Sequence, residues 1–319
     1  MSDEGYEFVP LPASVRRAER PHARHDMQVR DAITAAVSVA LVTEQPLHVG
    51  SGFKTLRDGR VVRAMVRSGE APCVPGSTLK GVLRSRFEAI TKSCALFRPN
   101  DRPESVRSSS FPGARARYTE SVLRGDVFRV CGASGPSCAA CALFGRMSLR
   151  GRVSVTDFVP AAAVETEVLE VAEMFSPNLH HVGSFTPREE YGKTVLEVHR
   201  LHGRKFARGR GPEAQGRERV EVVPVGTTFV GTLRLQNVTP DELGGLWAAL
   251  GIDPSSRLKV GGAKGHGLGR MRVGHTEVAH RGGVRVDVAR CVAAFQQSDD
   301  RWSDGLDALV RIHGEQAKP

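Results

Sequence analysis

The chain has 319 residues, and its 45 lysines and arginines against 35 aspartates and glutamates give a formal net charge of +10. This length suits one large domain or two small ones, and a hydrophobic fraction of 40% suffices for a sizeable core. We expect a cytoplasmic protein without a membrane span, because no run of eighteen apolar residues and no apolar signal region occur. The basic balance favours a polyanionic partner, although an arginine-rich proteome would give the same balance.

The first third of the chain predicts an arm, two strands and a helix. Residues 1–30 are rich in arginine and histidine, and we expect them to form a flexible N-terminal arm. Apolar alternation predicts a half-buried strand at 33–42, and a glycine turn separates it from a second strand at 60–66. The clearest helix covers 74–93, where Ser77 can act as the cap and one face is apolar through Leu79, Val82, Leu83, Phe87 and Ile90.

The remaining two thirds alternate between insertions and regular elements. Residues 95–130 read as loop, and further elements are predicted as strands at 152–160 and 227–238, a helix capped by Thr239 at 239–251, and a strand–glycine loop–strand unit at 258–273. Strands with two interspersed helices suit an α+β fold, and we predict a ferredoxin-like or RRM-like core with helices on one face of an antiparallel sheet. The predicted domain covers 31–275, with insertions at 94–145 and 176–217 and a C-terminal extension at 276–319.

Three of the six cysteines lie within eleven positions: Cys131, Cys138 and Cys141. Disulfides are rare in cytosolic proteins, whereas thiolates spaced as C-x-x-C can hold a tetrahedral zinc ion. Cys94 is the best candidate for a fourth ligand, because it ends the predicted helix. A structural Zn²⁺ would then join the two ends of an insertion that has little apolar material of its own.

Other interpretations of the cysteines stay open at this point. His22, His25 or His48 could supply the fourth ligand, or the thiols could be unliganded or redox-active. Cys73 and Cys291 read as small core residues.

Two segments combine glycine or aromatic residues with positive charge. The loop "GGAKGHGLGR" (261–270) carries Lys264 and His266, and its glycines would let backbone N–H groups approach an anion. It is not a Walker A loop, because no serine or threonine follows Lys264. A packed glycine turn without a ligand is an equally good interpretation.

The segment "HRLHGRKFARGRG" (199–211) carries Arg200, Arg204 and Lys205, and its Phe206 could stack on a base. A solvated loop is the alternative. Lys80 and Arg84, on the predicted helix, add a second basic surface.

The order of these motifs resembles the RAMP superfamily of CRISPR–Cas proteins, most closely the backbone (Cas-seven-like) subunits of type III and type III-derived effectors. The resemblance extends over about 33–273 and rests on "LHVGSG" (47–52), "VPGSTLKGVLRS" (74–85), "CxxCxLFG" (138–145) with an upstream "SC", "HGRKF" (202–206) and "VGGAKGHGLGRMRV" (260–273).

The resemblance implies a subunit that stacks along a guide RNA and inserts a thumb hairpin, here within 176–217, between guide and target. It implies RNA contacts from the glycine turn at His48, from the late motifs, and from the helix start through Ser77, Thr78, Lys80 and Arg84. The implied partners are guide and target RNA, other copies of the chain, other Cas subunits and a separate nuclease.

The sequence departs from the family where catalysis is expected. The aspartate that promotes metal-dependent cleavage would fall near Val62, whereas Asp58 lies about four positions earlier. We therefore expect a binding subunit. The alternatives are a nuclease using Asp58 and Mg²⁺, a metal-independent guide-processing ribonuclease using His48, His180 or His181, and an unrelated zinc-containing nucleic-acid binder.

Overall fold

A computed structural model of the chain describes residues 5–95, 104–106, 108–172, 177–209, 218–283 and 285–314. Its centre is a six-stranded sheet in which β2 (Ile33–Thr43) lies between β18 (Thr228–Val238) and β20 (Arg270–Gly283). Both neighbours are antiparallel to β2. The sheet is completed by the short strands β11 (Val153–Val155), β12 (Val159–Pro160) and β19 (Leu258–Lys259), which gives the order β11-β18-β2-β20-β19 with β12 also on β18.

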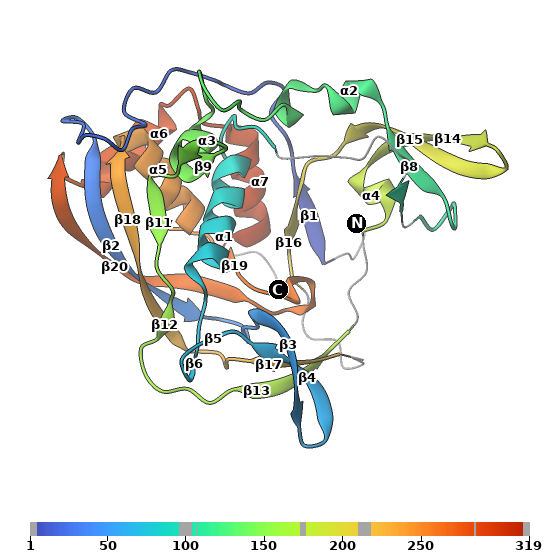
Figure 1. Cartoon of the computed structure of the whole chain (residues 1–319), viewed down its shortest axis with the longest axis horizontal. Coiled ribbons are helices and arrows are strands. Elements are labelled where there is room, and N and C mark those ends of the chain that lie inside the picture. The colour runs from blue at the N-terminus through green and yellow to red at the C-terminus, as the bar shows by residue number, and fades with distance from the viewer. Residues whose placement is uncertain are drawn as a thin grey trace.

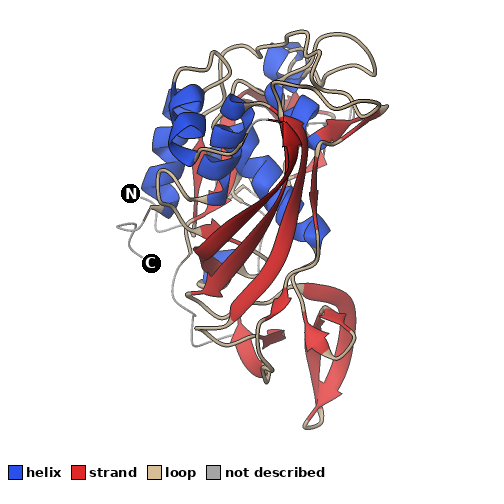
Figure 2. Ribbon diagram, turned by 90° about the vertical axis from the view of Figure 1, so that its left-hand side faces the viewer, coloured by secondary structure: helices blue, strands red, loops and turns tan. Residues whose placement is uncertain are grey.

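Apolar alternation along the long strands creates one buried face of this sheet. In β2 every second residue is buried, as at Ile33, Val37 and Leu41, and β18 repeats the pattern with Phe229 and Leu233. Side chains on a strand alternate between faces, so these residues share one face. The helices gather on one side of the long strands (Figure 2). They are α1 (Gly76–Ala89), α5 (Pro240–Leu250), α6 (Val288–Gln296) and α7 (Ser303–His313).

The helix predicted at 74–93 is confirmed with closer bounds, but Ser77 is not its cap. Pro75 is the N-cap, and the Asp157 carboxylate accepts a hydrogen bond from the Gly76 N–H at 2.8 Å. Gly76 is required here, because a Cβ atom would lie 2.1 Å from the Val155 carbonyl oxygen. Asp157 therefore joins the helix start to the end of β11.

Two smaller four-stranded sheets flank the body (Figure 1). One consists of β13 (Glu167–Val171), β17 (Glu218–Val222), β4 (Arg60–Met65) and β3 (Gly50–Arg57). The other consists of β14 (Gly183–Glu190), β15 (Lys193–Leu201), β8 (Arg115–Tyr118) and β7 (Glu104–Ser105), and its β14–β15 hairpin projects from the body. The predicted excursion at 176–217 thus contains a hairpin, while its residues 176 and 210–217 lie outside the described residues.

Shorter elements connect these sheets. They are the paired strands β5 (Arg67–Ser68) and β6 (Ala71–Pro72), the paired strands β9 (Gly145–Arg146) and β10 (Leu149–Arg150), and the short helices α2 (Glu120–Leu123), α3 (Ala139–Phe144) and α4 (Leu179–Val182). Part of the segment predicted as loop, 95–130, is therefore regular, and its residues 96–103 and 107 lie outside the described residues. No helix in the described ranges is long and apolar enough to cross a membrane.

The described part of the segment predicted as a flexible arm packs against the body. Strand β1 (Tyr6–Val9) pairs with β16 (Arg204–Ala207) and lies beside α7. Farther along, Arg20 forms a 2.8 Å ion pair with Asp300, and both side chains are buried. These long-range contacts fix residues that composition alone assigns to an arm.

Candidate metal centre and anion-binding groove

Four buried cysteines meet beside α1. The Sγ atoms of Cys94, Cys131, Cys138 and Cys141 all lie within 4.8 Å of one another. Cys94 Sγ is 3.7 Å from Cys138 Sγ and 3.6 Å from Cys141 Sγ, whereas a disulfide would need about 2 Å. Four sulfurs at about 2.3 Å from a tetrahedral ion lie about 3.8 Å apart. The cluster therefore has the dimensions of a metal site, and Cys94 joins the other three as the sequence predicts.

The three histidines that remained possible ligands are bonded elsewhere. His22 contacts the Glu242 carboxylate at 3.2 Å, and His25 contacts the Arg150 carbonyl oxygen at 2.9 Å. His48 donates from Nδ1 to the Glu221 carbonyl oxygen at 2.6 Å. The cysteine cluster needs none of them.

Two arginines predicted to bind RNA, Arg84 and Arg204, lie beside the cysteine cluster. Arg84 places Nη2 3.9 Å from Cys141 Sγ and donates from Nε to Glu88 at 2.8 Å. Arg204 donates to the other Glu88 oxygen at 2.8 Å and to the Cys94 carbonyl oxygen at 3.0 Å. Glu88 thus joins α1 to β16 next to the cluster.

A groove of about 390 Å³ runs between α1 and the glycine-rich loop. Helix α1 contributes the small residues Thr78, Gly81 and Ser85 to its lining, together with Val82. Its full lining is Val49, Gly50, Thr78, Gly81, Val82, Ser85, Gly261, Gly262 and Lys264. Glycine and short side chains let an extended ligand approach the backbone closely.

His48 lies beneath the glycines of this groove rather than within it. Its carbonyl oxygen accepts a hydrogen bond from the Gly262 N–H at 2.8 Å, and a Cβ atom on Gly261, which has φ +83, would lie 2.0 Å from the same oxygen. Burial lowers the pKa of the His48 imidazole. We therefore describe His48 as a neutral positioning residue for the glycine turn.

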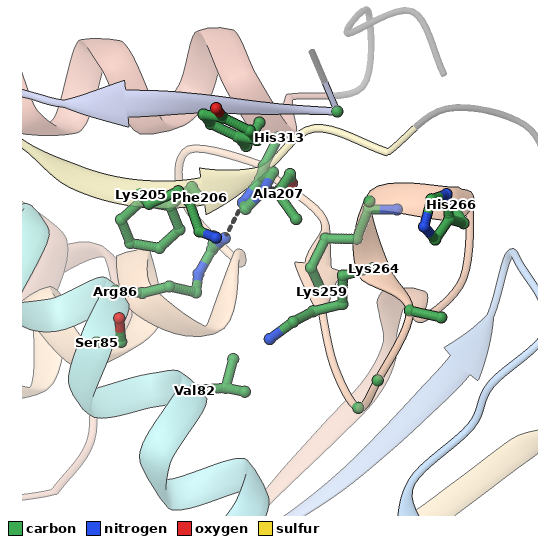
Figure 3. A pocket seen from close by; sticks show the side chains of 16 residues that line it. Val82, Ser85, Arg86, Lys205, Phe206, Ala207, Lys259, Lys264, His266 and His313 are labelled. Carbon is green, nitrogen blue, oxygen red and sulfur yellow. Dashed lines mark hydrogen bonds between the residues drawn. The ribbon is translucent and has the colours of Figure 1, made fainter. Parts of the chain in front are cut away.

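A deeper cavity of about 400 Å³ adjoins the groove. It shares Val82, Ser85 and Lys264 with the groove and lies between α1, β16, α7 and the glycine-rich loop (Figure 3). Its remaining lining is Gly5, Tyr6, Arg86, Lys205, Phe206, Ala207, Lys259, Gly261, Gly262, Ala263, Gly265, His266 and His313.

Three lysines give this cavity a positive wall: Lys205, Lys259 and Lys264. Within the described ranges, no carboxylate forms an ion pair with any of them. Burial, followed by the charges of Arg270 and Lys264, lowers the pKa of Lys259 to about 8. Burial and Lys205 likewise lower the pKa of Lys264. The lysines repel one another, and a bound anion would reduce this repulsion.

Behind the lysines is a buried arginine whose partners are all neutral. Arg86 is 1% exposed and donates to the Ala249 carbonyl oxygen at 2.6 Å and to His313 Nδ1 at 2.8 Å. Burial lowers its pKa to about 9, and burial with the Arg86 charge lowers the pKa of His313 to about 3. Because His313 Nδ1 accepts, its Nε2 carries the proton and donates to the Ala207 carbonyl oxygen at 2.9 Å.

The other predicted RNA contacts divide between the groove and other surfaces. Lys264, His266, Lys205 and Phe206 meet at the cavity, although Phe206 is buried and packs on the His313 ring with centroids 5.8 Å apart. Ser77 is exposed on α1 and does not line the groove, whereas Lys80 is partly buried. Burial, then Arg84 and Arg150, lower the pKa of Lys80. Arg200 is exposed on the projecting hairpin.

Asp58 is exposed at the tip of the β3–β4 hairpin. Its φ of 49° and the φ of 70° at Gly59 are the paired left-handed values that a two-residue Asp-Gly turn requires. Val62, near the position of the expected aspartate, is buried. Within the described ranges, the four cysteines form the one group of three or more potential metal ligands.

Among the cavity residues that sequence reasoning missed are Tyr6, Arg86, Lys259 and His313. Tyr6 reaches the cavity because β1 pairs with β16, and no local sequence pattern predicts this long-range pairing. Lys259 lies two positions before the predicted glycine loop, and its strand position could have indicated an inward side chain. Arg86 lies on the buried face of α1, between Leu83 and Phe87 in the chain, and that position was a usable signal.

Comparison with known proteins identifies the family of the chain. The sequence model of the RAMP superfamily matches residues 40–272, so the chain belongs to this superfamily. One solved structure that it resembles is titled "Cryo-EM structure of the Type III-B Cmr-beta bound to cognate target RNA", with 13% identity and a TM-score of 0.39. That match covers 78% of this chain and 61% of the other chain, so this chain spans about three fifths of its length. No curated protein matches.

Proposed function

We propose that this chain is an RNA-binding backbone subunit of a type III-like CRISPR effector. It holds the phosphate backbone of the guide RNA in the groove between α1 and the glycine-rich loop, stacks with other copies and Cas subunits along the guide, and positions target RNA. The β14–β15 hairpin is the proposed thumb. Membership of the RAMP superfamily supports this assignment.

The observation that carries the proposal is a groove with a glycine floor and a lysine that has no acidic partner in the described ranges. Gly50, Gly261 and Gly262 let a backbone come close, and Lys264 supplies charge between groove and cavity. A site built from glycines and charged side chains binds phosphate groups whatever the base sequence, and a guide-binding subunit must bind in this way.

The arrangement of the sheet supports a ferredoxin-like core for this function. The chain order β2-α1-β11-β18-α5-β20 is strand–helix–strand–strand–helix–strand, and the four strands lie in the sheet order β11-β18-β2-β20. This is the split βαβ pattern. α1 therefore has the place of the first crossover helix, with its outer residues free to line the groove.

We further infer that the cysteine cluster holds a structural zinc ion. Four thiolates are a ligand set that zinc prefers, and four protein ligands leave no open position for catalysis. Arg84, close to Cys141, would offset part of the negative charge of such a centre. The ion would fasten the insertion at 94–145 to α1.

We propose binding without cleavage for this subunit. The left-handed φ at Asp58 suits an Asp-Gly turn, so the turn alone explains an aspartate at this position. Val62, near the position where the family has its aspartate, is a buried apolar residue. The alternative, cleavage by Asp58 with Mg²⁺, predicts cuts in target RNA by the assembled complex that Asp58→Ala abolishes. Cleavage that disappears in this variant would replace the binding-only proposal.

The experiment for the proposed function is a salt titration of RNA affinity. Each lost phosphate contact should reduce the slope of log affinity against log salt by about one. Lys264→Ala should weaken binding of a single-stranded RNA and flatten this slope. Arg290→Ala is the matched control, because Arg290 is an exposed cation on α6, and α6 lines neither the groove nor the cavity. An equal effect of both variants would contradict the assignment of the groove.

A further inference from the structure

The cavity beside the groove has more apolar wall than contact with a phosphate group alone requires. Its volume of about 400 Å³ lies in the range of sites that enclose small organic ligands. Val82, Phe206, Ala207 and Ala263 contribute apolar wall, and Tyr6 contributes an aromatic ring. The neighbouring groove, by contrast, is lined mainly by glycines and short side chains.

The polar end of the cavity carries buried positive charge that the described residues do not neutralise. Lys259 is 6% exposed, and its Nζ donates to Gln45 Oε1 at 2.6 Å and to the Leu268 carbonyl oxygen at 3.3 Å. Arg86 donates only to neutral groups. Buried charges are normally paired, because desolvation is costly. Two such cations beside one cavity therefore indicate an anionic ligand.

The cavity also carries an aromatic side chain, Tyr6, next to one of its lysines. Lys205 Nζ lies 5.2 Å from the centroid of the Tyr6 ring, and Tyr6 itself is held on β1 by its pairing with β16. His266, from the glycine-rich loop, lines the same cavity. A planar heterocycle joined to an anionic group would meet both the aromatic side chain and the cations.

We propose that the cavity binds one complete nucleotide unit, with its base against Tyr6 and Val82 and its phosphate at Lys259 and Lys264. Two sources offer this chemistry: a nucleotide turned out of an RNA strand that lies in the groove, and a free nucleoside monophosphate. The first source rests on the proposed function, whereas the second does not.

The first experiment compares mononucleotides with their parts. AMP, GMP, CMP and UMP, the matching nucleosides and inorganic phosphate are titrated separately into the full chain by calorimetry. We expect at least one mononucleotide to bind about tenfold more tightly than inorganic phosphate, because a base stacked on an aromatic ring adds that much affinity. Equal affinities for phosphate and all mononucleotides, or no binding of either, would overturn the proposal.

Variants then assign the two ends of the cavity. Lys259→Met keeps the length of the side chain and removes its charge, so it should abolish mononucleotide binding without lowering the melting temperature. Tyr6→Leu should weaken mononucleotide binding about tenfold and leave phosphate binding unchanged, whereas Tyr6→Phe should retain the affinity. Equal losses in Tyr6→Leu and Tyr6→Phe would show a role of the hydroxyl group rather than stacking and would contradict the proposed base position.

A labelled RNA separates the two sources and keeps the two proposals distinguishable. An RNA carrying 2-aminopurine should change fluorescence on binding in wild type but not in Tyr6→Leu, while the salt slope stays unchanged. One outcome is RNA binding that depends on Lys264, with no effect of the Tyr6 variants and no mononucleotide binding. This outcome would support the proposed function and contradict the nucleotide cavity. Mononucleotide binding without RNA binding would support a free nucleotide as the occupant and would contradict the proposed function.

Discussion

Helix α1 lies beside two groups of side chains that would be neutralised by ions of opposite charge. The cysteine cluster gathers four potential anions entirely from this chain, buried and closed, so that a single cation would complete it. The lysine cavity gathers cations beside an open groove and holds no acid within the described ranges, so that an anion from outside would complete it. A closed ligand set indicates a structural site, whereas an open one indicates a binding site.

The largest effect should come from breaking the closed site. Cys138→Ser should remove the metal and lower the melting temperature by more than about 10 °C, because metal binding supplies folding free energy to the insertion. Elemental analysis and thermal melts measure both. Cys73→Ser is the control, since Cys73 is buried outside the cluster. If the two variants lost similar stability and neither lost metal, the cluster would not be a metal centre.

The next effect should come from the acid that connects the two sites. Glu88 holds Arg84 and Arg204, and Glu88→Gln removes the carboxylate that these two partly buried guanidinium groups share. We expect a loss of about 2–3 kcal/mol in the free energy of unfolding. Because Arg204 precedes Lys205 on β16, RNA affinity should also fall. Urea titration together with RNA binding tests this link, and unchanged RNA affinity at reduced stability would show that the two sites are independent.

A smaller, pH-dependent effect should come from His313. Its pKa is about 3 in the native protein and near 6.5 in the unfolded chain, so the unfolded chain takes up a proton first as the pH falls. Stability should decrease from pH 6.5 downward by at most about 1.4 kcal/mol per pH unit from this group. His313→Asn, which keeps an acceptor for Arg86, should remove this part of the slope in urea titrations. A parallel slope in both proteins would contradict the buried neutral imidazole.

The smallest effect concerns the start of α1. Asp157→Ala should cost about 1 kcal/mol, because the Gly76 N–H loses its acceptor, whereas Ser77→Ala should change stability by less than about 0.5 kcal/mol. Thermal melts of the two variants side by side check the difference. The reverse order would restore Ser77 as the cap.

The two sites also differ in how far the sequence predicts them. Cys131, Cys138 and Cys141 lie close together in the chain, and their spacing already indicates a metal site. Cys94 is the best candidate for the fourth ligand because of its place at the end of the predicted helix, although the sequence also leaves three histidines open. The lysine cavity joins Lys205, Lys259 and Tyr6, which are far apart in the sequence and meet through strand pairing and a glycine turn. Periodicity predicts β2, β18 and α1, because burial of one face repeats locally. Helix α5 is buried continuously from Glu242 to Leu250, and it is predicted instead from its Thr239–Pro240 start.

The ion pairs of the two arginines could not be predicted either, because they also form between segments that are far apart in the sequence. Arg84 and Arg204 read as free cations in the sequence, but they share Glu88 once α1 and β16 are adjacent. The sequence suggests that Phe206 could stack on a base, and the structure shows its side chain buried against His313. Residue type indicates what a side chain can bind, whereas the fold decides whether it is already occupied.

The central claim is that RNA lies along α1 and the glycine-rich loop, and hydrogen exchange tests it most directly. Mass spectrometry of the full chain with and without a single-stranded RNA should reveal slower amide exchange in peptides covering 76–85 and 258–269 when RNA is bound. The Lys264→Ala variant should lose this protection at the same RNA concentration. Protection confined to β2, β18 and β20, with none in these two segments, would contradict the account.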